Sequence, residues 1–287
     1  MVQRQYILAA DREEAQTALR ATYEMITIAQ LGGGDIVLAD QFWRDHLHEY
    51  TLSGLLGELL APLNDTERKE SKVGVSVIVE QSDQRVTGIR IKIHVVDPQR
   101  QFRPGAATFV LNKVFQVDEG GALTSKVETI VAPGRSRPYF RDQLLPILDR
   151  LGITKISLTA SQIMGYDAPG GVSVWARYGF IPDADQWGRM RDSGQQRLAA
   201  LPQDAGIREH IPALQQIYQD EDPKALRPLA LLAMQSVEVA EHVTAVLLVD
   251  QNWIGTIDLG DPEARRWITT YVRGNTEAFL AAMGVNQ

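Results

Sequence analysis

Three arginines gather around one turn near the middle of the chain. They are Arg135, Arg137 and Arg141, in or beside the Pro- and Gly-containing segment 132–138. The segment connects an expected strand to an expected helix, and the free N–H groups at the start of a helix favour an anion. Arginines at such a place suit a phosphate or a pyrophosphate. An ordinary solvated turn is the alternative, because a single basic turn is weak evidence for a ligand.

The elements that position this turn follow the order strand, helix, strand, helix. Residues 123–131 alternate in polarity, which predicts a strand. The apolar spacing of residues 144–151 predicts a helix that Gly152 ends. Residues 153–160 predict a second strand, and residues 171–180 a closing helix and its exit. A helix between two strands in so short a stretch has the size of a βαβ unit.

The sequence motifs of these segments resemble those of the GNAT acyltransferase superfamily. The resemblance rests on Val131-x-Pro133, on a helix with Leu144-Leu145, on the strand ending at Ala160, and on Val174-Trp-Ala-Arg-Tyr-Gly-Phe180. It covers roughly residues 73 to 183. The resemblance implies an α/β (α+β) fold with a mixed, largely antiparallel twisted sheet and flanking helices. It also implies acyl-CoA as co-substrate, with an acetyl or a longer acyl group, and no metal.

By the resemblance, the coenzyme A site would lie along the turn. The residues at the matching positions are Ile130, Val131, Ala132, Ser136, Arg137, Pro138, Tyr139, Arg141 and Trp175. Several of them depart from the family pattern. The family's glycine positions hold Arg137, Tyr139 and Arg141, although those glycines let the backbone approach the pyrophosphate closely. Trp175 stands at the position of the family's proton-donating tyrosine.

Two side chains are the candidates for the chemistry that the resemblance implies. Acyl transfer to an amine needs a deprotonated nucleophile and a proton for the departing thiolate. Glu128 lies just before the turn and is the candidate base, with a solvent-facing strand carboxylate as the alternative. Tyr178, the nearest phenol in the closing helix, is the candidate acid, with a core tyrosine as the alternative. No Ser, His and Asp arrangement of a serine hydrolase is evident.

The composition of the chain excludes several classes of protein and of functional site. The chain has 287 residues, 44% hydrophobic and 23% charged, as in an ordinary globular protein. Its net charge of −7 argues against broad nucleic-acid binding. It has no cysteine, which excludes disulfides, thiolate metal sites and a cysteine nucleophile. No apolar run is long enough to span a membrane and no signal-like core begins the chain, so we expect a cytoplasmic protein.

The rest of the chain predicts extensions on both sides of the core. We expect a helical segment over 1–72, a GNAT-like core over 73–190 and a helical extension over 191–287. Within the first, Asp11 starts a helix whose apolar stripe runs to Ile28, residues 36–38 form a short strand, and Asp40 caps a second helix. Four strands of a β-meander fill 73–131. Asp261-Pro262-Glu263 starts a helix that we expect to reach Met283.

Two hypotheses from different classes follow. The first is an N-acyltransferase that moves an acyl group from a coenzyme A thioester directly to an amine of a peptide, protein or small molecule. The second is a GNAT-shaped binding or structural protein without the reaction, motivated by the bulky residues in the turn and by Trp175. The tail with Asp258-Leu-Gly-Asp-Pro262 resembles acetyltransferase-like domains of phage-associated and toxin-like proteins, which implies that type for this second hypothesis. We expect no nucleic-acid partner. The sequence leaves the acceptor, the acyl length and the oligomeric state open.

Overall fold

The structure is a computed structural model of the full chain. It describes residues 7–23, 25–28, 36–61, 63, 71–82, 85–96, 107–131, 136–160, 171–200, 207–235, 237–242 and 252–285. The chain divides into two compact units, Met1–Ile156 and Ser157–Gln287, which we call unit 1 and unit 2. Each is described by itself. The predicted three-part division stays a prediction.

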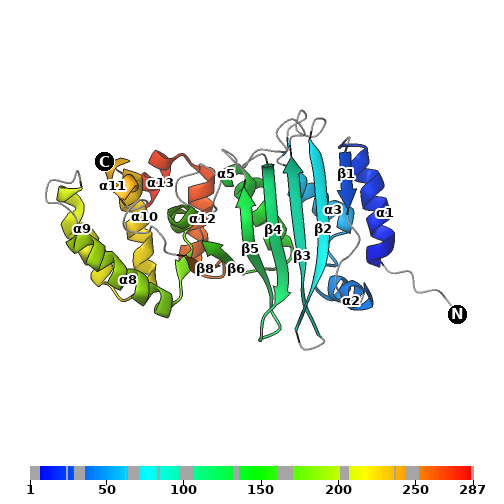
Figure 1. Ribbon diagram of the computed structural model, residues 1–287, viewed down its shortest axis with the longest axis horizontal. Coiled ribbons are helices and arrows are strands. Elements are labelled where there is room, and N and C mark those ends of the chain that lie inside the picture. Colours follow the sequence, from blue (N-terminus) through cyan, green and yellow to red (C-terminus); the bar gives the residue numbers. More distant parts are fainter. Residues whose placement is uncertain are drawn as a thin grey trace. The chain divides into compact units, whose positions relative to one another are not determined.

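Unit 1 is built on a mixed, largely antiparallel sheet, as the sequence predicts. Its strands lie in the order β1 (Met25–Ile28), β2 (Lys72–Ser82), β3 (Arg85–Val96), β4 (Ala107–Val117) and β5 (Leu123–Val131) (Figure 1). Strand β1 pairs with β2 in parallel, whereas β2 to β5 form the predicted antiparallel meander. The observed bounds of β5 are those that polarity alternation predicts.

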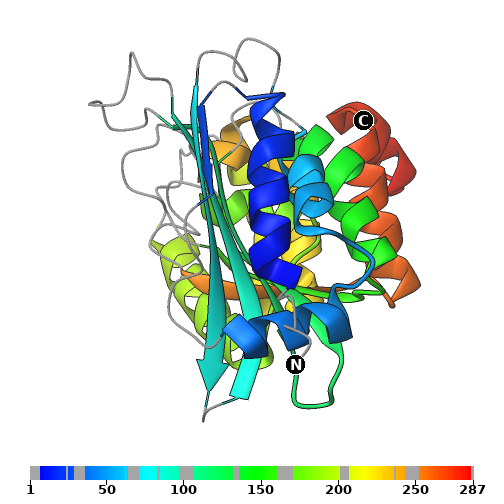
Figure 2. The ribbon, with the colours of Figure 1, turned by 90° about the vertical axis from the view of Figure 1, so that its right-hand side faces the viewer.

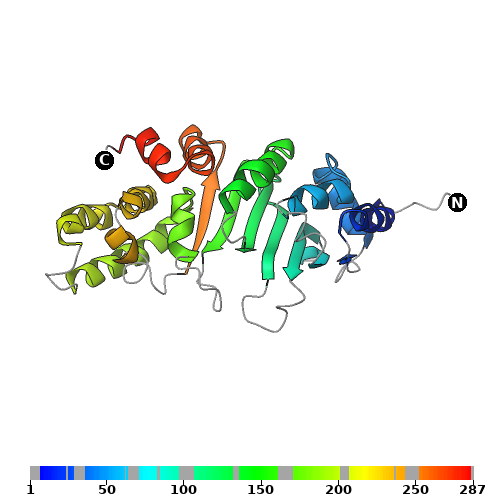
Figure 3. The same ribbon diagram turned by 90° about the horizontal axis from the view of Figure 1, so that it is seen from above.

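The helices of unit 1 lie on one side of this sheet, as the edge-on view shows (Figure 2). They are α1 (Ile7–Arg20), α2 (Ile36–His46), α3 (Leu52–Leu60), α5 (Ser136–Tyr139), the π-helical segment η1 (Phe140–Leu144) and α6 (Leu145–Arg150). Seen from above, α3 and α6 cover the same face (Figure 3). The chain turns out of α6 at Gly152, whose φ of +66° favours glycine.

The two faces of the β2–β5 sheet differ in character because side chains alternate along a strand. The face under the helices, which we call the covered face, is apolar and buried. It includes Val73, Val75, Val77, Ile89, Ile91, Ile93, Phe109, Leu111 and Phe115. No described helix of unit 1 lies over the opposite face, which we call the open face. The alternate residues of each strand, most of them polar, point to it.

Unit 2 is mainly helical. Strand β6 (Lys155–Ala160) crosses the division between the units, and the other elements are α7 (Gly171–Arg177), β7 (Ile181–Pro182), α8 (Ala184–Ala199), η2 (Arg208–His210), α9 (Ile211–Gln219), η3 (Pro223–Ala225), α10 (Leu226–Gln235), α11 (Val237–His242), β8 (Trp253–Asp258), α12 (Pro262–Arg273) and α13 (Thr276–Ala282). Strands β7 and β8 pair antiparallel. Trp187 of α8 stacks on Tyr218 of α9 with ring centroids 6.0 Å apart, which joins the two helices.

Three expectations for the N-terminal segment are wrong. The first helix runs from Ile7 to Arg20, so it begins before Asp11 and ends before the predicted stripe does. Ile26 and Ile28 lie in β1, where they are buried on either side of exposed Thr27. Residues 25–28 form a strand because their backbone groups hydrogen-bond to β2. This pairing outweighs the weak local preference for a helix. Residues 36–38 begin α2 rather than forming a strand. Asp40 therefore lies inside α2, where it pairs with Arg44 at 2.8 Å instead of capping the helix.

The expected C-terminal extension also needs correction. It contains strand β8, so it is not wholly helical. The helix that starts at Asp261 ends at Arg273, and Asn275 caps a separate helix α13 by accepting a hydrogen bond from the Ala278 N–H. The predicted start is confirmed, since the Asp261 carboxylate accepts from the Glu263 N–H at 3.0 Å. No helix among the described residues has the length and apolarity needed to cross a bilayer.

Candidate functional site

A β-bulge lies where the charged side chains of unit 1 concentrate. Asn112 of β4 pairs with Thr129 of β5, but the next residue, Lys113, pairs with Val127. Glu128 is therefore an extra residue on β5. A bulge of this kind re-aims side chains and is common beside functional sites. Here it leaves the Glu128 side chain on the open face, while Lys113 lies on the covered face opposite Ile91.

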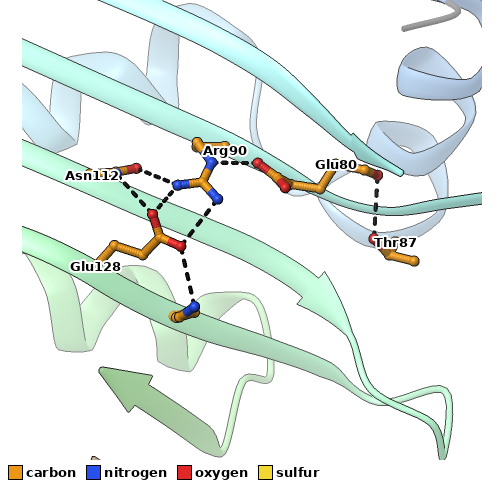
Figure 4. Close-up of polar contacts among 6 residues, drawn as sticks. Glu80, Thr87, Arg90, Asn112 and Glu128 are labelled. Atoms are coloured by element: carbon orange, nitrogen blue, oxygen red, sulfur yellow. Dashed lines mark hydrogen bonds and ion pairs between the residues drawn. The ribbon is translucent and has the colours of Figure 1, made fainter. Parts of the chain in front are cut away.

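On the open face, one guanidinium joins residues of four strands (Figure 4). Arg90 of β3 donates through Nε to Glu80 of β2 and through both terminal nitrogens to the Glu128 carboxylate, with Nη2 3.1 Å from Oε1. Asn112 of β4 accepts from Arg90 at 3.3 Å and donates to Glu128 Oε2 at 2.9 Å. Lys126 Nζ lies 3.2 Å from Glu128 Oε1. We call these five residues the Arg90 network.

The network holds Glu128 in its charged form. Partial burial raises the pKa of this carboxyl, but the hydrogen bonds from Arg90 and Lys126, with the positive charges of the same two groups, outweigh it and leave the pKa lowered. The hydrogen bond to Glu80 is the largest of the effects that raise the pKa of Arg90. A carboxylate with a lowered pKa and three donors around it is a weak proton acceptor. The geometry thus favours a structural role, and the predicted base role stays a prediction.

The described residues of unit 1 that are predicted to bind coenzyme A form no polar contact with the Arg90 network. Ala132 falls outside the described residues, Ile130 is half-buried in β5, and only the backbone of Val131 is described. Ser136 and Arg137 are half-buried at the start of α5, beside exposed Pro138. None of the described residues 136–141 contributes a hydrogen bond or an ion pair to Glu128.

Two bulky residues at the expected glycine positions have clear structural partners. Tyr139 is fully buried, and its ring packs edge-on against Phe109 of β4 with centroids 5.5 Å apart. Burial raises the pKa of its hydroxyl. Arg141 is exposed and pairs with its neighbour Asp142, with Nη2 2.6 Å from Oδ2. Tyr139 therefore anchors the helix to the sheet, and the charge of Arg141 is offset locally.

In unit 2, Trp175 and Tyr178 belong to an aromatic cluster at the end of α7. Tyr178 is 1% exposed, and its ring lies 5.6 Å from that of half-buried Trp175 and 4.8 Å from that of Tyr271 in α12. These contacts place both residues in the packing of unit 2. Their predicted roles, acid for Tyr178 and coenzyme A contact for Trp175, stay predictions.

The glycine of the Tyr-Gly-Phe sequence has a direct structural reason. Gly179 has a φ of +89°, and a Cβ there would lie 2.6 Å from Cδ1 of Trp267. The same indole donates from Nε1 to the Arg177 carbonyl at 2.9 Å. The motif on which the resemblance rests therefore also packs against Trp267 of α12.

A residue that the sequence reasoning missed is Lys113. It is fully buried on the covered face, its amine contacts Ser125 Oγ, and it lies 5.0 Å from the centroid of the Phe115 ring. Burial lowers its pKa to about 7. The signal was present: Phe109, Leu111, Lys113 and Phe115 alternate along one strand, which puts the lysine on the apolar side. Ser125 is also fully buried, so the pair is closed to a substrate.

The described residues hold no group of three His, Asp or Glu side chains arranged to bind a metal ion. No protein-family model matches the chain, and neither curated proteins nor solved structures give a significant match.

Proposed function

We propose that this chain is a non-catalytic binding protein whose core resembles an acyltransferase in its order of elements. The observation that carries the proposal is the state of Glu128. This carboxylate is the sequence's candidate base, yet it accepts hydrogen bonds from Arg90, Asn112 and Lys126 and its pKa is lowered. A base for amine deprotonation needs a free lone pair and a pKa nearer the working pH.

The contacts of the turn give further support. A site for a pyrophosphate needs close approach of the backbone and cations that are available to the anion. Tyr139 fills its position with a buried ring, and Arg141 already pairs with Asp142. Within the described part of unit 1, the open face carries the Arg90 network and lies under no described helix, and we infer that it binds a partner.

The test is a thiol-release assay with acetyl-CoA and palmitoyl-CoA in the presence of a mixture of primary amines, run beside isothermal titration calorimetry. We expect no release above the uncatalysed background. Turnover that disappears in Glu128→Gln, while thioester binding persists, would establish the reaction and overturn the proposal. Gln41→Glu, an exposed change on α2, is a control for nonspecific charge effects on the assay.

An N-acyltransferase acting on an amine of a peptide, protein or small molecule is the second candidate. The observation in its favour is the order of elements: β5 leads into a helix that begins at Ser136, and β6 follows. On this candidate, Arg137 contacts the phosphates of acyl-CoA. Calorimetry would then show binding of the thioester, weakened in Arg137→Ala by about 1–3 kcal/mol, the range for a charge-assisted hydrogen bond. Arg150→Ala, which removes an exposed arginine paired with Glu58, is the matched control.

A further inference from the structure

We propose that the β2–β3 part of the open face docks an acidic polypeptide segment, with Lys72 and Lys92 as the anchoring cations. The inference rests on the proposed binding function and names the chemistry of the partner. Its basis is an imbalance of charge on this face. The acidic groups there are already neutralised, whereas two lysines are not.

The carboxylates of the open face have their partners within the sheet. Glu80 pairs with Arg90, and Glu128 pairs with both Arg90 and Lys126. With four contacts to three strands, Arg90 is committed to this network. The two carboxylates and the two cations balance one another, so the network contributes no net charge to the face.

The charges of Lys72 and Lys92 are not neutralised by any carboxylate in the described part of the chain. Both are exposed, and neither forms an ion pair or a side-chain hydrogen bond within the described part of the chain. Lys92 stands opposite Ser76, and Lys72 stands opposite Val96, four residues further along β3. Their Cα positions are therefore about 14 Å apart along the strand direction. Exposed Gly74 and His94 pair between them, so the surface there carries one small residue and one polar ring.

The sequence concentrates positive charge in the same region. Residues 71–96, which span β2 and β3, contain four Lys and Arg against two Asp and Glu, although the whole chain has a net charge of −7. The rest of the chain is correspondingly acidic. A partner with negative charge is therefore attracted to this segment and repelled elsewhere, which orients it during encounter.

The make-up of the face selects a polypeptide over other anions. Single-stranded nucleic acids bind on aromatic side chains that stack with the bases. Phe109 and Phe115, the phenylalanines of the described β2–β5 strands, both lie on the covered face. His94 brings one imidazole ring to the open face, and a single ring gives no platform for successive bases. An interfacial membrane site needs exposed large apolar side chains, and none of those described on β2–β5 is exposed. Carboxylates at alternating positions of an extended peptide match the strand-aligned lysines.

The experiment measures fluorescence anisotropy of a labelled twelve-residue poly-glutamate peptide with the full chain, at low and at physiological salt. We expect salt-sensitive binding that weakens about tenfold in Lys72→Glu/Lys92→Glu, because two surface ion pairs are replaced by two repulsions. Arg20→Glu/Arg189→Glu is the control matched in charge, because it also replaces two exposed cations by carboxylates. Arg20 lies on α1, on the helical side of the sheet of unit 1, and Arg189 lies on α8 of unit 2, so this variant should alter binding less than twofold.

Each other outcome overturns the inference. Absence of binding at low salt, or equal losses in Lys72→Glu/Lys92→Glu and in Arg20→Glu/Arg189→Glu, removes the docking surface. Tighter binding of twelve-residue oligothymidine, or of phosphatidylserine vesicles, than of the peptide removes the polypeptide as occupant. Circular dichroism melts of each variant verify the fold. The thiol-release assay on the same samples separates the two proposals, since turnover removes the binding function, whereas face-independent binding without turnover removes this inference alone.

Discussion

Replacing Lys113 by methionine should make unit 1 more stable, and the gain should depend on pH. Methionine is close to lysine in length and is apolar, so it fills the same space among Ile91, Val127 and Phe115. The substitution removes a buried amine that has no carboxylate partner among the described residues. It also leaves the Ser125 hydroxyl without that amine.

The size of the effect follows from the pKa. Burial lowers the pKa of Lys113 from 10.5 to about 7, and each unit corresponds to 1.36 kcal/mol, so the lysine destabilises the fold by at most about 5 kcal/mol. The unfolded chain binds a proton more readily than the folded chain between pH 7 and pH 10.5. Stability therefore rises with pH in that window, with the full penalty present below about pH 7 and lost near pH 10.5. The unpartnered Ser125 hydroxyl offsets about 1–3 kcal/mol of the gain.

Hydrogen exchange read by mass spectrometry on peptides of β3, β4 and β5 is the suitable assay, because it reports on unit 1 separately from unit 2. At pH 7 the protection of these strands should be greater in Lys113→Met than in the wild type, and the difference should shrink by pH 9.5. Lys92→Met, a substitution of an exposed lysine on the neighbouring strand, should show no such trend. A gain in protection for Lys113→Met that is the same at every pH would refute the claim that burial lowers the pKa of Lys113.

Three further substitutions test the packing described above. Glu128→Gln should lower the free energy of unfolding of unit 1 by about 1–3 kcal/mol. It should also remove the stability that the wild type has above the ordinary Glu pKa of 4.5 and loses as pH falls through the lowered pKa of Glu128. Urea titrations at pH 3 to 7 would measure both effects, and equal pH profiles of variant and wild type would contradict the reasoning. Gly179→Ala combines a φ of +89° with a contact of 2.6 Å to the Trp267 ring, so we expect a fall in melting temperature of several degrees, larger than for the open position Gly188→Ala. Asp261→Ala removes the cap of α12 and should cost about 1 kcal/mol, seen by thermal melting, with exposed Glu241→Ala in α11 giving the comparison for charge.

The sequence predicts the meander and β5 well because alternation continues over many residues there. It fails at β1, where only four residues form the strand and Ile26 also fits a helical stripe after Tyr23. Strand β8 was missed because exposed Ile254 interrupts the polar face that alternation would otherwise show. Local patterns carry no information on which distant strand supplies hydrogen-bonding partners.

At the candidate site, too, the positions of residues along the chain could be predicted from the sequence, whereas their contacts with distant strands could not. The position of Glu128 before the turn was predictable. Its engagement with Arg90 was not, because the two residues lie 38 positions apart and meet only when β3 to β5 align in register. Tyr139 likewise needed the partner Phe109 on another strand before its burial could be known.

The Arg90 network also has an order in time during synthesis of the chain. Glu80 precedes Arg90 by ten residues, so the hairpin of β2 and β3 can form with one carboxylate already facing the guanidinium. The second carboxylate, Glu128, is made only when β5 leaves the ribosome. Until then the emerging sheet carries an arginine with half of its acidic partners, and docking of the last strand completes the set. The network, which links β2, β3, β4 and β5, can therefore be complete only after β5 has been made.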